Sequence, residues 1–291
     1  MKINQILPLE AKFTEVLASI AVMPKMLYYY GKMPEKHVKT VAIVGARKNT
    51  DYGYDVAYEA AYELAKRGVV IVSGLALGID SVAHRAALDA GGVTVAVLGT
   101  PIEKIYPARH IGLAREIVEK GGMVMSEYRE VDKINYRVSF LQRNRIISGL
   151  SDVVIVAEAA ERSGSLNTAT HALEQGREVF AVPGDIRRET SKGCNRLIMQ
   201  GAQPYTGVGD VLSVLFPEEL SVSGKRGKRA IVGDNEAETT ILRAIYSGMR
   251  EGEAIVDALK MGVAEFNRTI TLLEIKGRVR VLGGNSWGFV K

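Results

Sequence analysis

The 291-residue chain has almost no cysteine, which excludes several classes of protein. Its single cysteine, Cys194, rules out a disulfide within the chain and a metal site built from several thiolates. The four histidines show no spacing typical of metal ligands, so we expect no bound metal. No apolar run approaches the roughly 20 residues that cross a bilayer, and residues 1–16 lack the apolar segment of a signal peptide. We therefore expect a cytoplasmic protein without membrane contact.

Two common nucleotide-binding motifs are also missing. No GxxxxGK[ST] stretch is present, which excludes the usual P-loop, and the glycines of GLALG at 74–78 do not have the GxGxxG spacing. ATP or nicotinamide chemistry therefore lacks its usual support, and we expect no cofactor. The net charge of +5 and the isoelectric point near 9.1 permit an anionic partner without requiring one.

From residue 39 onward, short β-branched runs alternate with helical segments. The expected strands are Val41–Val44, Val69–Val72, Val93–Leu98, Met123–Ser126, Asp152–Ala157 and Val179–Val182. The expected helices are Asp55–Arg67, Ser81–Ala90, Ile111–Lys120, Ser139–Ser148, Leu166–Gln175 and Asn195–Gln200. This alternation predicts an α/β fold, a doubly wound parallel sheet covered by helices on both faces. Its ligand crevice should lie at the carboxyl ends of the strands.

The composition divides the chain into four parts. Residues 1–38 form a short extension with one expected helix, Phe13–Ile20, and residues 39–217 form the α/β domain. Residues 218–233 are rich in serine, glycine, lysine and arginine, as expected of a basic flexible linker. Residues 234–291 predict three helices and a hairpin, the winged-helix pattern. Eight basic and eight acidic side chains leave that last part without net charge, so it lacks the electrostatic footprint of a duplex-DNA binder.

Two helix N-termini are candidate anion sites. Ser73, Gly74 and Leu75 join the strand ending at residue 72 to an Ala-rich helix, and Gly164 and Ser165 open another helix. Amide groups and the helix dipole favour phosphate at such ends, and glycine lets the phosphate approach the backbone. The alternatives are a tight turn without a ligand in the first case and simple N-capping by serine in the second.

Arginines and one aromatic residue complete the candidate site. Arg47 directly follows the first strand, where its guanidinium matches the geometry of phosphate oxygens. In the segment 135–150, Phe140, Arg143 and Asn144 share a helical face, and Arg145 adds a further positive charge. An exposed aromatic ring beside arginines is typical of single-strand binding, through stacking and phosphate contacts. The alternative is that Phe140 belongs to the core and the arginines to a solvated face.

Other polar residues receive structural interpretations. His84 and His171 lie in Ala-rich helices and are expected to be packed and hydrogen-bonded. Asp80 is better explained as a helix cap or loop brace than as a general base. Cys194 has no histidine nearby in sequence, which argues against a nucleophile.

Five ordered segments between Leu27 and Phe216 resemble the DprA (Smf) family of DNA-processing proteins: VAIVGARKNTDYG, VSGLALGIDSVAH, FLQRNRIISGLSD, SGSLNTATHALEQGREVFAVPGD and GCNRLIMQGA. The resemblance implies an extended Rossmann-like domain that binds single-stranded DNA, forms a homodimer and loads RecA during natural transformation and recombination. It implies phosphate contacts at Arg47, at the turn 73–75 and at the turn 164–165. Phe140 and Arg143 would line the same groove. The family often has a helical N-terminal domain, where this sequence has only the short extension.

Two other functions compete with sequence-independent capture and protection of single-stranded DNA. The core also resembles lysine-decarboxylase-like enzymes that cleave nucleoside monophosphates, whose PGGxGTxxE motif carries a glutamate. Thr170 stands at that glutamate's position, so we expect no enzyme activity. The other alternative is an adaptor that handles RecA and whose DNA contact is incidental.

Overall fold

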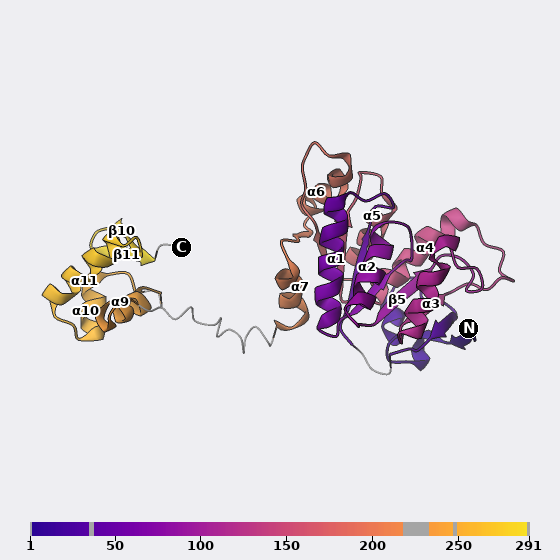
Figure 1. Ribbon diagram of the computed structural model, residues 1–291, viewed down its shortest axis with the longest axis horizontal. Helices are drawn as coiled ribbons and strands as arrows, with labels where there is room; N and C mark the ends of the chain where they lie inside the picture. Colours follow the sequence, from indigo (N-terminus) through magenta and orange to yellow (C-terminus); the bar gives the residue numbers. More distant parts are fainter. Residues whose placement is uncertain (1, 35–37, 218–232, 247–248, 290–291) are drawn as a thin grey trace. The chain divides into compact units, whose positions relative to one another are not determined.

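The computed structural model describes residues 2–34, 38–217, 233–246 and 249–289. The chain divides into two compact units, Met1–Phe216 and Pro217–Lys291 (Figure 1). The linker predicted at 218–233 lies outside the described residues, apart from residue 233.

The first unit is built on a nine-stranded sheet with the order β1-β2-β6-β5-β4-β3-β7-β8-β9. From β6 to β9 all neighbours in this order are parallel, whereas β2 pairs antiparallel with β6 and with β1. The strands are β1 (Asn4–Ile6), β2 (Leu27–Gly31), β3 (Thr40–Gly45), β4 (Val70–Ser73), β5 (Thr94–Leu98), β6 (Met123–Ser126), β7 (Val153–Glu158), β8 (Glu178–Ala181) and β9 (Gln203–Pro204). The predicted doubly wound parallel sheet is thus confirmed.

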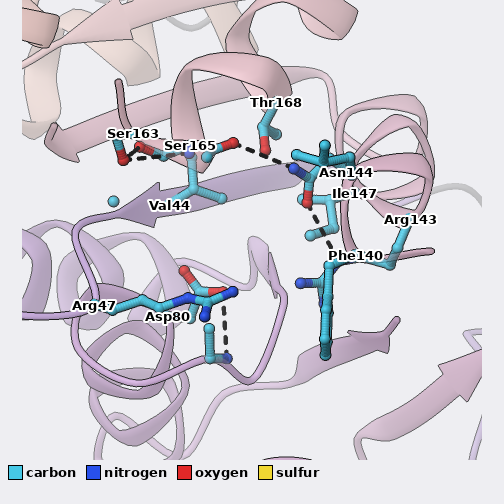
Figure 2. A pocket seen from close by; sticks show the side chains of 14 residues that line it. Val44, Arg47, Asp80, Phe140, Arg143, Asn144, Ile147, Ser163, Ser165 and Thr168 are labelled. Carbon is cyan, nitrogen blue, oxygen red and sulfur yellow. Dashed lines mark hydrogen bonds between the residues drawn. The ribbon is translucent and has the colours of Figure 1, made fainter. Parts of the chain in front are cut away.

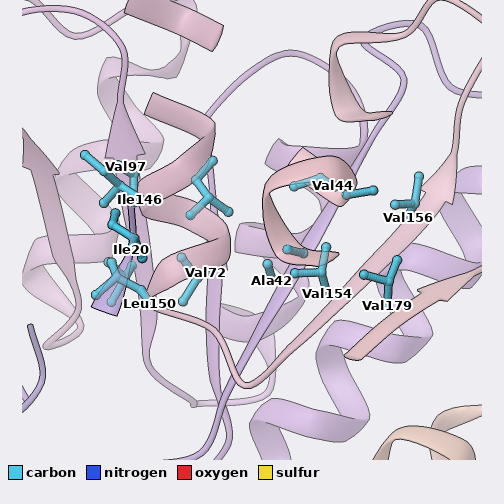
Figure 3. Close-up of a cluster of buried hydrophobic side chains, with 14 of the residues drawn as sticks. Ile20, Ala42, Val44, Val72, Val97, Ile146, Leu150, Val154, Val156 and Val179 are labelled. Atoms are coloured by element: carbon cyan, nitrogen blue, oxygen red, sulfur yellow. The ribbon is translucent and has the colours of Figure 1, made fainter. Parts of the chain in front are cut away.

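Helices cover both faces of the sheet. They are α1 (Asp51–Lys66), α2 (Ile79–Asp89), α3 (Ile111–Glu119), α4 (Tyr136–Gly149), α5 (Gly164–Glu174), α6 (Lys192–Met199) and α7 (Val208–Leu215). Apolar residues of α4, α5 and α6 pack on one face, where Ile146 and Leu150 meet Val72, Val97 and other strand residues (Figure 3). Residues of α1, α2, α3 and α7 pack on the other face. The continuous β-branched strands are buried on both sides, as expected of a parallel sheet between two helical layers.

Residues 4–6 and 27–31, within the predicted short N-terminal extension, belong to the sheet. They supply β1 and β2, which the sequence analysis did not predict. The helix expected at Phe13–Ile20 is instead a 3₁₀ turn over Glu15–Ser19. Phe13, Leu17 and Ile20 are nevertheless buried, because they pack against α4 and the core. Three apolar contacts are compatible with a short 3₁₀ turn as well as with an α-helix.

The direction of winding reverses at β3. This strand pairs with β4 on one side and with β7 on the other, although more than 100 residues separate β3 from β7. The loops that follow β3 and β7 therefore leave the sheet toward opposite faces. In doubly wound folds, ligands bind at such a switch point, in the crevice between the diverging loops.

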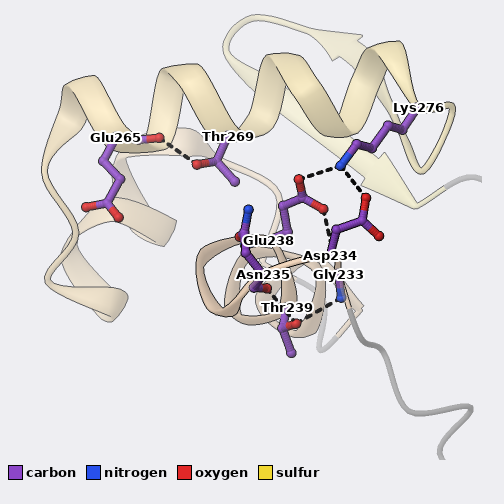
Figure 4. Close-up of polar contacts among 8 residues, drawn as sticks. All are labelled: Gly233, Asp234, Asn235, Glu238, Thr239, Glu265, Thr269 and Lys276. Carbon is purple, nitrogen blue, oxygen red and sulfur yellow. Dashed lines mark hydrogen bonds and ion pairs between the residues drawn. The ribbon is translucent and has the colours of Figure 1, made fainter.

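In its described residues, the second unit has three helices and a hairpin: α9 (Glu236–Tyr246), α10 (Gly252–Leu259), α11 (Val263–Ile275), β10 (Val279–Gly283) and β11 (Ser286–Phe289). Its core is formed by residues of the three helices and by Val279. Lys276 bridges Asp234 and the buried Glu238, at 2.6 and 2.7 Å, which ties the end of α11 to the start of α9 (Figure 4). This order of elements agrees with the predicted pattern, and its assignment as a winged helix stays a prediction.

Candidate functional site

A cleft of about 250 Å³ lies at the switch point between β3 and β7. It is bounded by the loop after β3, the first turns of α5 and one face of α4 (Figure 2). Of the predicted site residues, Arg47, Phe140, Arg143, Gly164 and Ser165 line this cleft. The structure therefore brings together side chains that lie more than 100 positions apart in the sequence.

Arg47 is held at the mouth of the cleft by its backbone. The amide of Ala46 donates to the carbonyl of Glu158 at 2.7 Å, and the carbonyl of Ala46 accepts from the amide of Ile79 at 3.2 Å. The Arg47 side chain is exposed, and its guanidinium carbon lies 5.8 Å from the centre of the half-buried Phe140 ring. A fixed loop thus presents a guanidinium and an aromatic ring to the same space.

The N-terminus of α5 forms the opposite wall. Ser163 caps the helix by accepting from the amide of Ser165 at 3.4 Å, and the Ser163 and Ser165 hydroxyls lie 2.7 Å apart. Gly164 is exposed, and no atom would lie within 4 Å of a Cβ placed on it. Capping and an accessible helix N-terminus therefore coexist here, and the macrodipole favours an anion in front of Gly164.

The first predicted anion site, the turn after β4, is braced by the chain's own side chains, and its contact with DNA stays a prediction. The Ser73 hydroxyl is buried and donates to the carbonyl of Ile43 at 2.7 Å. The amides of Gly74 and Ala76 donate to Oδ2 of Asp80, at 3.1 and 3.4 Å, and the Leu75 side chain is buried. A carboxylate of the chain itself therefore accepts from two of the amides that a phosphate would use at this helix N-terminus. Asp80 is the loop brace that the sequence indicated.

Arg143 lines the cleft but is not a free phosphate clamp. Its side chain is only 5% exposed, and Nη1 donates to the carbonyls of Gly74 and Val97. Its Nε donates to Oδ1 of Asn144 at 3.3 Å. The guanidinium thus holds the turn after β4 against the end of β5, and its direct contact with DNA stays a prediction.

Arg145 lies outside the cleft. Residues two apart on a helix point to nearly opposite sides, so Arg145 faces away from Arg143. Its guanidinium forms a bidentate pair with Glu127, at 2.9 and 2.6 Å, and donates to the carbonyl of Val22 at 2.9 Å. Arg145 therefore holds the N-terminal segment and the residue after β6, and its contact with DNA stays a prediction.

Buried charge shapes the electrostatics of the cleft. Burial raises the pKa of Asp80, whereas Arg143 and the amides of Ala76 and Gly74 act to lower it. Burial also lowers the pKa of Arg143 to about 10, opposed by the charge of Asp80. Arg143 thus stays protonated at neutral pH. The two buried groups offset each other, and the exposed Arg47 remains available to an anionic ligand.

Two other residues that the sequence singled out, His84 and Cys194, are buried in the fold. His84 is fully buried, and its Nδ1 lies 2.7 Å from Oγ1 of Thr94, while burial lowers its pKa to about 3. Burial raises the pKa of the Cys194 thiol to about 12, which makes a thiolate nucleophile unavailable.

In the described part of the chain no group of histidine, cysteine and acidic side chains is arranged to hold a metal ion. None of the helices described there is both long and apolar enough to cross a membrane.

Sequence reasoning did not assign a role to three residues at the cleft. The Asn144 side chain joins α4 to α5 by donating to the carbonyl of Gly164 and to Oδ1 of Asn167. The Thr168 side chain lines the cleft, and the Tyr106 ring packs 5.6 Å from that of Phe140. The sequence placed Asn144 on the helical face of Phe140 but gave no sign of its bonds to α5. Thr168 and Tyr106 depend on tertiary contacts.

The model of the family DNA recombination-mediator protein A matches residues 4–216. The chain belongs to this family. It is 45% identical over 214 residues to protein Smf of Escherichia coli, which covers 73% of this chain but only 57% of the relative. The chain therefore spans little more than half of that relative's length.

Two solved structures of family members resemble the first unit. One is DNA processing protein A of Streptococcus pneumoniae, with 39% identity and a TM-score of 0.64, covering 73% of this chain and 74% of the other. The second is DNA processing protein A of Helicobacter pylori, described for its single-stranded DNA binding mode. It has 30% identity and a TM-score of 0.65, and the match covers 75% of this chain and 97% of the other.

Proposed function

We propose that this chain binds single-stranded DNA without sequence selection, through the cleft between Arg47 and α5. The observation that carries the proposal is the convergence of three groups on one small space. These are an exposed guanidinium, a half-buried aromatic ring and an open helix N-terminus. Together they can hold one phosphate and stack one base, which is the chemistry of single-strand binding.

The size of the cleft favours a single strand. Its volume of about 250 Å³ accommodates a unit of nucleotide size, and its walls come from loops on both sides of the switch point. A base paired in a duplex could not reach Phe140 without leaving the helix. The single-stranded DNA binding mode described for the Helicobacter pylori relative supports the same conclusion.

The cellular role proposed here is protection of incoming single strands and loading of RecA, in natural transformation and recombination. We propose a homodimer as the acting form. Membership of the DNA recombination-mediator family supports this role. Residues 234–291, which carry no net charge, would then contact protein rather than duplex DNA.

Nucleotide cleavage is not favoured. The position expected to hold a catalytic glutamate is Thr170, which is exposed and donates its hydroxyl to the carbonyl of Leu166. The carboxylate that lines the cleft, Asp80, is already engaged by two backbone amides. We therefore propose a binding protein and not an enzyme.

The test is the affinity of the purified chain for oligo-dT and for duplex DNA at several salt concentrations. We expect Arg47→Ala to weaken oligo-dT binding about tenfold and to reduce the salt slope by about 0.7, the value for one phosphate contact on a single strand. Arg115→Ala is the matched control, because Arg115 is exposed on α3 outside the cleft. Equal oligo-dT affinities for the two variants would contradict the proposed site.

A further inference from the structure

Two polar atoms face the cleft without a partner. The Asp80 side chain is 6% exposed, and both of its amide donors bind Oδ2, so that no described residue hydrogen-bonds to Oδ1. The Thr168 side chain is 1% exposed, and no hydrogen bond to its hydroxyl is formed by the described residues. Both side chains line the cleft (Figure 2). Because both oxygens lie at the cleft without a hydrogen-bond partner among the described residues, they can bond to a ligand held there.

The free hydroxyl of Thr168 has a structural cause. A helical threonine commonly donates to the carbonyl four residues earlier, as Thr170 does to Leu166. For Thr168 that carbonyl belongs to Gly164, and it accepts from Nδ2 of Asn144 at 3.3 Å instead. Asn144 thereby leaves the Thr168 hydroxyl available to the cleft.

The free oxygen of Asp80 is equally fixed. Oδ2 is held by two amides of the turn after β4, and the Arg143 guanidinium packs against the same glycine, Gly74, from the side. The carboxylate therefore cannot rotate without losing both amide bonds. Its Oδ1 is a preorganised acceptor, while the Thr168 hydroxyl can act as a donor.

An acceptor and a donor that face one cleft select a complementary pair on the ligand. Thymine and guanine carry a ring N–H next to a carbonyl on their pairing edge. Cytosine and adenine carry a ring nitrogen lone pair at that position. A lone pair facing the Asp80 carboxylate would leave two acceptors opposed, whereas a ring N–H would satisfy it.

We propose that the cleft holds one base of the bound strand and prefers thymine or guanine, with Asp80 accepting from the ring N–H and Thr168 donating to the adjacent carbonyl. This inference rests on the proposed binding of single-stranded DNA. It adds a preference at one nucleotide to binding that the phosphates otherwise make independent of sequence.

The experiment measures fluorescence anisotropy of full-length protein with labelled oligo-dT, oligo-dU, oligo-dC and an oligomer of N3-methylthymidine, all of one length. We expect oligo-dT and oligo-dU to bind at least about fivefold more tightly than oligo-dC, since one good base contact discriminates by about that factor or more. The N3-methyl oligomer, which lacks the ring N–H but keeps the thymine stack, should bind as weakly as oligo-dC.

Two variants connect the preference to the residues. Thr168→Val keeps the shape of the side chain and should reduce the ratio of oligo-dT to oligo-dC affinity at least twofold. Thr170→Val, on the exposed side of the same helix, should leave the ratio unchanged. Asp80→Asn keeps an acceptor for the two amides but presents a donor to the cleft, so it should shift the ratio toward oligo-dC.

The outcomes separate this inference from the function on which it rests. If oligo-dT binding depends on Arg47 but equals the binding of oligo-dC and of the N3-methyl oligomer, the preference is overturned and the binding function stands. If no oligonucleotide binds, or binding is indifferent to Arg47→Ala, the proposed function fails first. Because Thr168→Val is isosteric, the test does not depend on whether Asp80→Asn folds.

Discussion

Arg47 and Arg143 both reach the cleft, yet their surroundings give them different tasks. Arg47 is exposed and meets the aromatic ring of Phe140, so its charge is available to a ligand. Arg143 is buried and donates to two backbone carbonyls. The sequence placed both arginines at the cleft. Residue type and spacing therefore do not distinguish the exposed arginine from the buried one. The difference depends on whether another part of the chain supplies acceptors.

Replacement of Arg143 is expected to act on stability. Arg143→Met would leave the carbonyls of Gly74 and Val97 without their donor and Asp80 without its compensating charge, so we expect a loss of about 3 kcal/mol or more in the free energy of unfolding. Urea denaturation measures this loss, and Arg115→Met, on the exposed face of α3, is the control. Equal stability of the two variants would show that Arg143 is not the brace described here.

His84 predicts a specific response to acid. Its pKa is about 3 in the folded chain against an ordinary value of 6.5, so between these values the unfolded chain binds more protons and stability falls as the pH falls. His84→Gln removes this proton uptake. Its free energy of unfolding, measured by urea denaturation from pH 7 to pH 4, should therefore fall less steeply than that of the wild type, by up to about 1.4 kcal/mol per pH unit. Parallel curves for the two proteins would contradict a buried neutral histidine.

At the scale of elements, sequence located every α-helix and strand from residue 39 to residue 200 but misplaced several helix starts. Helix α1 begins at Asp51, four residues earlier than predicted, because Thr50 caps it by accepting from the amide of Gly53. Helix α4 begins at Tyr136 through the corresponding cap at Asn135. Apolar periodicity reports only the turns that face the core, whereas these first turns depend on polar capping side chains. The strands β1 and β2 were missed because three to five residues at a sheet edge carry little periodicity.

The glycine-rich turn after β4 illustrates a limit of motif reasoning. Its glycine is required by the chain's own side chains, since a Cβ on Gly74 would lie 2.5 Å from Nη1 of Arg143 and 2.6 Å from Oδ2 of Asp80. A glycine demanded by close packing and a glycine demanded by a phosphate look alike in sequence. Only the carboxylate of Asp80, which lies within hydrogen-bonding distance of the turn, distinguishes them.

Gly74→Ala tests that close packing. Both neighbouring groups are fixed by hydrogen bonds, so we expect a loss of about 2 kcal/mol in the free energy of unfolding, typical of overpacking. Gly112→Ala is the matched control, because Gly112 lies in α3 with no atom within 4 Å of a new Cβ. That control should be neutral or slightly stabilising. A Gly74→Ala protein as stable as the control would mean that the turn has room to spare.

At the scale of the whole molecule, the two units have separate cores and unequal charge. Residues 234–291 carry no net charge, and the cleft lies entirely within the first unit. A chain truncated after residue 233 should therefore keep its oligo-dT affinity within about twofold and keep its salt slope, which reports the number of phosphate contacts. Anisotropy titrations of both chains at several salt concentrations measure this. A marked loss of slope on truncation would assign phosphate contacts to the second unit.

The antiparallel pair β1 and β2 has a practical consequence for anyone who trims this protein. A start at residue 39, where the regular alternation begins, would leave β6 unpaired along one side, and β6 is a fully buried run of Met123, Val124, Met125 and Ser126. Unprotected apolar strands recruit one another, so such a fragment should precipitate where the intact chain stays monodisperse in light scattering. The opening residues therefore complete the sheet on the side where an unpaired strand would otherwise pair with a strand of another molecule.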